Sequence, residues 1–130
     1  MAQHRETVTA LNAPAAVGPY AQAIRSGGLL FCSGQIPLDP GTGELVPGGA
    51  AEQTRRCLEN LGAVCSAAGT TLSEAVRVTV YTTELEAFAE INEAYATFFE
   101  AEPPARVTVG AAALPAGATV EVDAIVAMTD

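Results

Sequence analysis

The sequence contains no lysine and a single histidine, His4. Without lysine the chain cannot form a Schiff base with a substrate, and it cannot build the phosphate-binding loop whose lysine contacts a nucleotide. One histidine near the N-terminus argues against a Ser-His-Asp triad and against a histidine-ligated metal. A glycine-rich dinucleotide fingerprint is also missing. We therefore expect no cofactor and no metal, so an enzyme of this composition would rely on positioning and on carboxylate acid–base chemistry.

Positive charge is scarce as well. The chain has six arginines and 15 acidic residues, which gives a net charge of −9 and a pI near 4.4. Proteins that bind nucleic acids use clustered lysines and arginines to neutralise phosphates. The only adjacent basic pair here is Arg55-Arg56, in an otherwise acidic, helix-like stretch. This composition disfavours a nucleic-acid partner. The electric field of the net negative charge would also repel an anionic substrate unless an arginine were set in a pocket to receive it.

Long apolar runs and a cysteine framework are also absent. Apolar residues make up 49% of the chain, but no run approaches the roughly 20 residues that cross a bilayer. Met1–Thr9 lacks the apolar core of a signal peptide. Cys32, Cys57 and Cys65 are odd in number and fit neither a zinc site nor a disulfide framework, so we expect buried free thiols. A single domain over residues 1–130, cytoplasmic and without membrane association, is the expectation.

Apolar periodicity and turn residues predict six strands and two helices. The strands are expected at Thr7–Leu11, Ala21–Ser26, Leu29–Gln35, Val76–Thr83, Arg106–Ala113 and Thr119–Met128, and the helices at Ala50–Ala68 and Leu85–Glu100. On the second helix, Phe88, Tyr95 and Phe98 follow helical spacing and are expected to be core residues. This order predicts an α+β fold with a single sheet and two helices on one face.

The other face of that sheet is predicted to be apolar too. Alternation along the last two strands places apolar residues, among them Val107, Val109, Val120 and Val122, on both faces. Two helices can cover only one face, and a large exposed apolar surface normally indicates a partner. The simplest partner is another copy of the chain. We therefore expect a homo-oligomer.

Two charged residues near the C-terminus are candidates for chemistry. Arg106 begins one β-rich segment and Glu121 lies on the strand that follows. Arginine can hold a carboxylate through two parallel hydrogen bonds, a geometry that lysine does not reproduce. Taken alone, Arg106 is more often a surface charge or a structural ion pair, and Asp123, on the face of Glu121, is an alternative partner. An adjacent arginine would lower the pKa of Glu121 and burial would raise it; the sequence leaves that balance open.

Several ordered motifs resemble the Rid/YjgF family of reactive intermediate deaminases, once described as endoribonucleases or translation inhibitors. They are Asn12-Ala13-Pro14-Ala15-Ala16, Gly18-Pro19-Tyr20, Ser33-Gly34-Gln35-Ile36-Pro37, Asn60-Leu61, Phe88-Ala89-Glu90-Ile91-Asn92 with Tyr95, and the stretch from Pro104 to Asp123. The resemblance covers nearly the whole chain. It implies a mixed six-stranded sheet of the chorismate-mutase-like type and a barrel-like homotrimer with active sites in clefts between subunits.

The resemblance also implies a reaction and its residues. The family hydrolyses 2-imino acids and enamines such as 2-aminoacrylate to 2-keto acids and ammonia, which clears reactive metabolites. The family's carboxylate-binding arginine matches Arg106, and the glutamate credited with handling the attacking water matches Glu121. Other positions near the cleft match Tyr20, Ser33, Gly34 and Asn92. Thr108 stands where the family often has cysteine, and its hydroxyl is a candidate hydrogen-bond donor.

Two other functions remain open from the sequence. One is a non-catalytic or regulatory protein that binds small carboxylates in the same cleft. Retention of Glu121 beside Arg106 favours the enzyme, because a binder of anions has no need for a carboxylate there. The other is an endoribonuclease or translation inhibitor, which the charge of −9 and the missing lysines disfavour.

Overall fold

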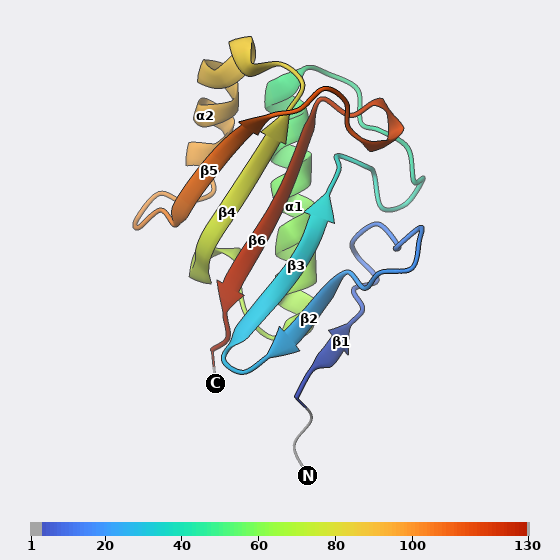
Figure 1. Ribbon diagram of the computed structural model, residues 1–130, viewed down its shortest axis with the longest axis vertical. Helices are drawn as coiled ribbons and strands as arrows, with labels where there is room; N and C mark the ends of the chain where they lie inside the picture. Colours follow the sequence, from blue (N-terminus) through green and yellow to red (C-terminus); the bar gives the residue numbers. More distant parts are fainter. Residues whose placement is uncertain (1–3, 130) are drawn as a thin grey trace.

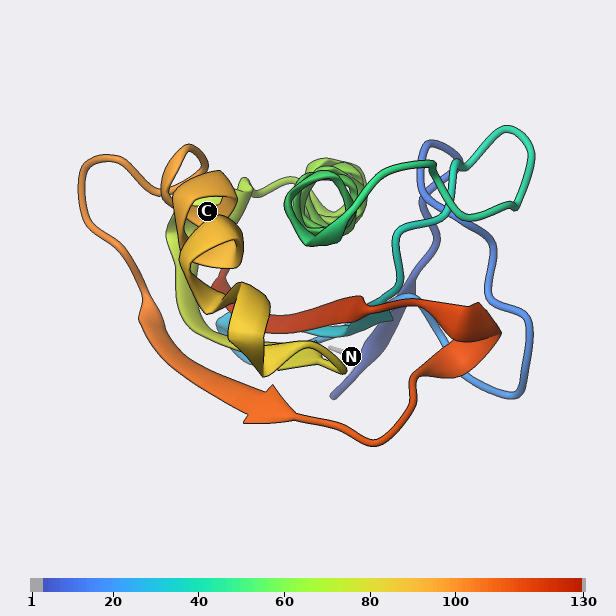
Figure 2. The same ribbon diagram turned by 90° about the horizontal axis from the view of Figure 1, so that it is seen from above.

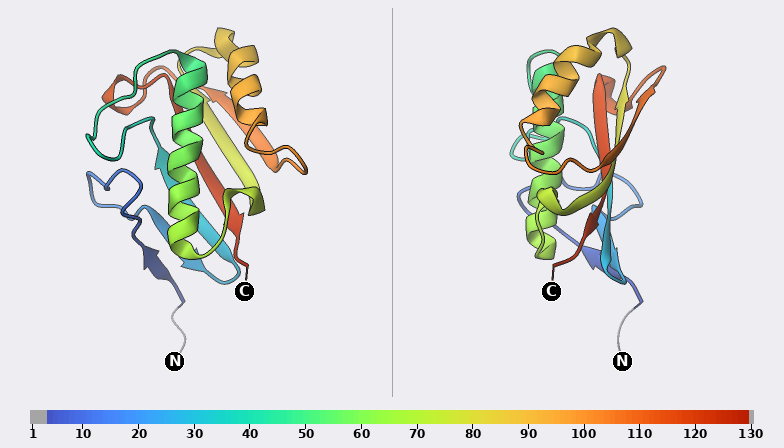
Figure 3. Two further views of the ribbon diagram at one scale, coloured as in Figure 1. Left: turned by 180° about the vertical axis from the view of Figure 1, so that it is seen from behind. Right: turned by 90° about the vertical axis from the view of Figure 1, so that its left-hand side faces the viewer.

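The computed structural model describes residues 4–129, which form one six-stranded sheet with two helices on one face (Figures 1 and 3). The strands are β1 (Glu6–Val8), β2 (Ala23–Ser26), β3 (Leu29–Gln35), β4 (Ala75–Thr82), β5 (Ala105–Gly110) and β6 (Val120–Ala127), and the helices are α1 (Ala50–Ala68) and α2 (Phe88–Ala96). The predicted α+β class and layer arrangement are confirmed. No helix among residues 4–129 is both long and apolar enough to cross a membrane.

The sheet is mixed. Its strand order is β1-β2-β3-β6-β4-β5, so the last strand of the chain lies between β3 and β4 (Figure 1). The β4–β5 pair is parallel and the other four pairs are antiparallel. A parallel pair needs a crossover connection, which here contains α2. That crossover places α2 over the β5 edge of the sheet, beside α1 (Figure 2).

The hydrophobic core fills the layer between the sheet and the helices. Along β6, residues 120, 122, 124 and 126 are buried and alternate with partly exposed ones, as expected for a strand with one covered face. The largest fully buried apolar side chains are Leu30, Leu58, Leu61, Ile91, Val64, Val78, Val80, Val120, Val122 and Val126. Cys32, Cys57 and Cys65 are buried and free, as predicted.

Helix α1 has the bounds that the sequence predicts because both of its ends are specified locally. At the start, the Gly49 amide donates to Glu52 Oε1 over 3.0 Å, which satisfies an otherwise unpaired backbone group. At the end, Gly69 adopts a positive φ of 90°, a conformation that glycine reaches without a steric penalty. In mid-helix, the Asn60 amide donates to the carbonyls of Ile36 and Leu38 over 3.3 and 3.0 Å, so α1 holds the chain that leaves β3.

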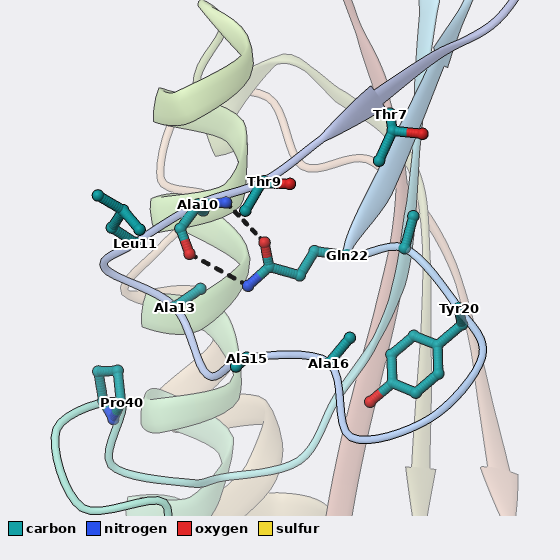
Figure 4. Close-up of a pocket in the computed structure, with 11 residues that line it drawn as sticks. Thr7, Thr9, Ala10, Leu11, Ala13, Ala15, Ala16, Tyr20, Gln22 and Pro40 are labelled. Carbon is teal, nitrogen blue, oxygen red and sulfur yellow. Dashed lines mark hydrogen bonds between the residues drawn. The ribbon is translucent and has the colours of Figure 1, made fainter.

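The N-terminal segment is held by a buried glutamine (Figure 4). The Ala10 amide donates to Gln22 Oε1 over 2.6 Å, and Gln22 Nε2 donates to the carbonyls of Ala10 and Pro14 over 3.2 and 2.8 Å. These side-chain bonds replace sheet pairing, because one amide group can satisfy both the donor and the acceptor of a backbone residue. The predicted strand Thr7–Leu11 is therefore wrong at its end, and β1 stops at Val8.

The second helix and β5 are shorter than predicted. Residues 85–87 form a 3-10 turn before α2, and beyond residue 96 the amides of Thr97, Phe98 and Phe99 bond three residues back. Strand β5 ends at Gly110, where a Cβ would lie 2.6 Å from Leu85 Cδ1. The expectation that Phe88 is a core residue is wrong, because 44% of it is exposed. Tyr95 is buried, and Phe98 is partly buried against the core.

Candidate functional site

The two charged candidates lie on opposite faces of the sheet in one chain. Arg106 pairs with Val78, which is buried under the helices, so the arginine side chain lies on the helix side. Glu121 lies between the buried Val120 and Val122, so its carboxylate lies on the helix-free side. Its partner on β4 is Tyr81.

The two residues are also displaced along the sheet. Strand β4 separates β5 from β6. Glu121 is level with Tyr81 and Val109, three residues from Arg106 along β5. With about 3.3 Å per residue and about 4.8 Å between strands, the two Cα atoms are about 14 Å apart. One chain therefore does not bring the guanidinium and the Glu121 carboxylate together.

Four of the predicted site residues gather on the Glu121 side, around a cavity of about 350 Å³. Its walls are Val17, Tyr20, Ser33, Gly34, Ile36, Pro115 and Glu121. They come from the loop before β2, from the irregular end of β3 and from the loop and start of β6. The Ser33 hydroxyl donates to the Ala21 carbonyl over 2.5 Å, which ties β3 to the loop that carries the half-exposed Tyr20.

Gly34 makes room for the carboxylate of Glu121. A Cβ at residue 34 would lie 3.0 Å from Glu121 Cδ and 3.3 Å from Cγ, and closer still to Oε2. Any side chain here would collide with the carboxyl group, since real Cβ contacts shorter than 3.0 Å are essentially never seen. Glycine at this position therefore lets Glu121 lie directly against the backbone of β3.

The sequence leaves open whether the pKa of Glu121 is raised by burial or lowered by an arginine, and the surroundings of this residue within one chain favour the first. Burial raises the pKa of the Glu121 carboxyl group, and the nearby charge of Asp123 raises it further. Asp123 itself accepts a hydrogen bond from the Tyr81 hydroxyl over 2.9 Å. The partner of Asp123 is therefore Tyr81 and not Arg106.

Arg106 lies against aromatic rings on the other side of the sheet. Its Cζ is 4.7 Å from the ring centre of Tyr95 and 5.7 Å from that of Phe88, both on α2. Among residues 4–129 the ion pairs are Arg55–Glu52 and Arg56–Glu59, and neither involves Arg106.

The other predicted residues on the helix side are Asn92 and Thr108. Asn92 lies one turn from Phe88 and from Tyr95 on the same face of α2. Its Oδ1 atom is buried without a hydrogen-bond partner. Thr108 shares the face of Arg106 on β5. Tyr95 was predicted only as a core residue, and its place beside Arg106 was missed. Its spacing of seven residues from Phe88, with Asn92 between them, puts all three on one face of α2 and could have indicated it.

The predicted residues thus form two half-sites. The helix-side half-site consists of Arg106, Thr108 and Asn92, and the cavity half-site consists of Tyr20, Ser33, Gly34 and Glu121. The first offers a cation to an anionic ligand, and the second offers a carboxylate with a raised pKa in a cavity. No group of three or more His, Cys, Asp or Glu side chains within residues 4–129 is arranged to hold a metal ion.

Residues 10–128 match the family model described as Endoribonuclease L-PSP. The chain belongs to this family, which is also called YjgF/RidA. The match spans both half-sites and confirms the resemblance seen in the sequence motifs.

Individual relatives of the YjgF/RidA family match the chain along nearly its whole length. The RutC family protein y4sK of Sinorhizobium fredii is 50% identical over 124 residues, which cover 95% of this chain and 98% of that protein. A mouse protein named 2-iminobutanoate/2-iminopropanoate deaminase is 42% identical over 121 residues, covering 93% and 90%. The crystal structure of RidA from the Antarctic bacterium Psychrobacter sp. PAMC 21119 superposes with a TM-score of 0.91 at 40% identity, covering 95% and 99%. The family therefore has this fold and includes proteins named as imino-acid deaminases.

Proposed function

We propose that this protein is a cofactor-free deaminase that hydrolyses 2-imino acids and their enamine tautomers to 2-keto acids and ammonia. The observation that carries the proposal is the pair of half-sites: a guanidinium without an ion-pair partner among residues 4–129 and a carboxylate of raised pKa in a cavity. The 42% identity to a mouse protein named as such a deaminase supports the same reaction.

In this proposal the complete site forms between two copies of the chain. Support comes from the opposite faces of Arg106 and Glu121, which one chain cannot join. Phe31, Val107 and Val109 leave apolar surface on the helix-free face, 43, 39 and 39% exposed, and such surface favours association. A contact that joins different faces of two copies repeats from copy to copy, and it forms a ring when the rotation between copies closes. The homotrimer implied by the family resemblance is such a ring.

The chemistry asks little of the site, because imines already hydrolyse in water. Arg106 holds the substrate carboxylate through two parallel hydrogen bonds, and this fixes the imine carbon in position. Thr108 donates a further hydrogen bond to substrate or water. The substrate thus lies between the guanidinium of one copy and the cavity half-site of the next.

Glu121 of the second copy manages the protons. It accepts a proton from water as the water oxygen bonds to the imine carbon, and it returns that proton to nitrogen. In the second step Glu121 takes the hydroxyl proton of the resulting carbinolamine and passes it to the amino nitrogen, the C–N bond breaks, ammonia leaves and the carbon keeps the oxygen as the keto group. A raised pKa suits Glu121 to both steps, because an acid–base group works best when its pKa is near the working pH.

An imine-clearance assay tests this function. An amino-acid oxidase generates 2-imino acids in the presence of semicarbazide, and the enzyme is expected to suppress semicarbazone formation. Losing a positioned, charged hydrogen-bond partner costs about 2–5 kcal/mol, so Arg106→Ala is expected to lower kcat/KM at least ~30-fold. Glu121→Gln is expected to lower it ~100-fold, as for the loss of a general base.

Arg55→Ala is the matched control, because Arg55 is an exposed arginine on α1 whose ion pair within residues 4–129 is with Glu52. It is expected to retain wild-type clearance. Failure of the wild-type protein to clear small, large and aromatic imino acids would contradict the deaminase proposal.

A non-catalytic carboxylate binder is the second candidate, and the same unpaired Arg106 favours it. It predicts Arg106-dependent binding of 2-keto acids with no clearance of imino acids, which the same proteins distinguish. An endoribonuclease, the description of the family model, has less support. Arg55 and Arg56 already face Glu52 and Glu59 on α1, and the net charge is −9. Salt-sensitive RNA binding that disappears in the variant Arg55→Glu/Arg56→Glu would favour it.

A further inference from the structure

The guanidinium of Arg106 lies over two aromatic rings of α2 and makes no ion pair within residues 4–129. Its Cζ lies over the rings of Tyr95 and Phe88, 4.7 and 5.7 Å from their centres. Both distances are within the ~6 Å at which a cation is attracted to the face of an aromatic ring. We propose that these two rings form an aromatic seat for Arg106, and that Tyr95 is the positioning residue that holds the guanidinium ready for a carboxylate ligand. The catalytic consequence rests on the proposed function.

An aromatic seat positions the arginine without using its hydrogen bonds. The ring attracts the cation through its π face, whereas the five N–H donors of the guanidinium lie in the guanidinium plane. A carboxylate partner would instead occupy two of those donors. No ion pair within residues 4–129 involves Arg106, so the donors stay available for a ligand. The seat thus replaces the holding role that a structural ion pair would otherwise have.

Tyr95 is the more rigid part of the seat. It is 6% exposed, and its ring packs on that of Phe99 with centres 4.7 Å apart and planes inclined by 37°. Phe88 is farther from the guanidinium and 44% exposed. A ring fixed in the core can fix the group above it, whereas a half-exposed ring gains less from a cation that water also solvates. We therefore expect Tyr95 to dominate.

Removing the Tyr95 hydroxyl group distinguishes the role of the ring from that of the oxygen. This oxygen is buried without a hydrogen-bond partner, and an unpaired buried polar atom destabilises the fold. Tyr95→Phe therefore removes no hydrogen bond and retains the ring, which makes it the matched control for Tyr95→Leu. Phe88→Leu removes the weaker half of the seat at a site where loss of packing is small, because Phe88 is half exposed.

The position of the guanidinium can be measured without any ligand. The chain has six arginines and no lysine, so a nitrogen–proton spectrum of the arginine Nε–H groups contains few signals, and Arg106→Ala assigns the one of interest. The aromatic ring current should shift the Arg106 Hε signal upfield in the wild-type protein and in Tyr95→Phe. It should return toward the exposed-arginine position in Tyr95→Leu, and move less far in Phe88→Leu.

The functional consequence is measured on wild type, Tyr95→Phe, Tyr95→Leu and Phe88→Leu. Titration with 2-oxobutanoate gives the Kd of each protein, and the imine-clearance assay gives its KM and kcat. Loss of a cation–π contact corresponds to roughly 3- to 30-fold in affinity, so the Kd and the KM of Tyr95→Leu should rise about tenfold. Its kcat should change much less, because the ring orients the group that binds and not the group that transfers protons. Tyr95→Phe should stay within about twofold of wild type in both.

Two results would overturn the seat. One is an unchanged Arg106 signal in Tyr95→Leu; the other is a loss of affinity in Tyr95→Phe equal to that in Tyr95→Leu, which would assign the effect to the hydroxyl. Failure of the proposed function gives a different result: the wild-type protein then clears no imino acids, whether or not it binds 2-oxobutanoate through Arg106. The ligand-free Arg106 signal still decides on the seat in that case.

Discussion

Replacing Gly34 with alanine should displace the carboxylate of Glu121 while leaving the fold nearly intact. The new Cβ would lie 3.0 Å from Glu121 Cδ, 3.3 Å from Cγ and closer to Oε2, so either the strand or the side chain must move. The carboxylate is the end of a flexible side chain and moves more easily than a strand. Overpacking of this kind costs about 1 kcal/mol or somewhat more, which corresponds to a fall in Tm of roughly 4 °C.

The effect on catalysis should be much larger than the effect on stability. A misplacement of about 1 Å in a reacting group can lower the rate ~100-fold. We therefore expect kcat/KM for imine clearance to fall about 100-fold in Gly34→Ala, with a thermal denaturation curve that shifts only slightly. Gly28→Ala is the control, because a Cβ at residue 28 meets no atom within 4 Å and needs no positive φ; its activity should equal that of wild type.

A double-mutant cycle checks the cause. With Glu121→Ala in place the added Cβ has no carboxylate to meet, so Gly34→Ala should become less destabilising by about 1 kcal/mol, a coupling typical of residues in contact. If Gly34→Ala costs the same free energy of unfolding in the Glu121→Ala protein as in the wild-type protein, the steric argument is wrong. Full activity in Gly34→Ala would refute it as well.

Two further changes test the surroundings of the site. Asp123 raises the pKa of Glu121, so Asp123→Asn should lower that pKa. The basic form of Glu121 then persists to lower pH, and the acidic limb of the pH–rate profile should move to lower pH; a move to higher pH would contradict this assignment. Gln22→Ala removes three buried hydrogen bonds to Ala10 and Pro14, at about 1 kcal/mol each. Chemical denaturation should show that the free energy of unfolding falls by roughly 2–4 kcal/mol, and limited proteolysis between residues 10 and 20 should become faster.

The sequence predicts the elements whose ends are determined locally. Helix α1 follows from the capping residues Gly49, Glu52 and Gly69, and β3 from its turn and its apolar run, and both have the predicted bounds. The errors arise where distant residues intervene. Gln22 takes the backbone groups of Ala10 away from β1, and Leu85 packs closely against Gly110, the last residue of β5. Neither contact is visible in the periodicity of a single segment.

The sequence motifs name the residues of the candidate site, but they do not predict how these residues are arranged in space. Alternation along β5 separates Arg106 and Thr108 from Val107 and Val109, yet the polar pair lies on the helix side and the valines on the open face. This reverses the usual rule that apolar side chains point toward the covered face. The arrangement follows from the parallel pairing of β5 with β4 and from the place of α2, which are long-range features. The two half-sites therefore emerge only with the assembled sheet.

The most direct test of a site shared between copies mixes two inactive variants. Arg106→Ala and Glu121→Gln proteins are unfolded together, refolded at equal amounts and assayed for imine clearance. If Arg106 and Glu121 of each site come from different copies, random mixing should restore both residues in about one quarter of the sites, and activity should recover to about that fraction of wild type. If the mixture stays as inactive as each variant alone while forming mixed oligomers, the two residues do not act across an interface and the proposed site is wrong.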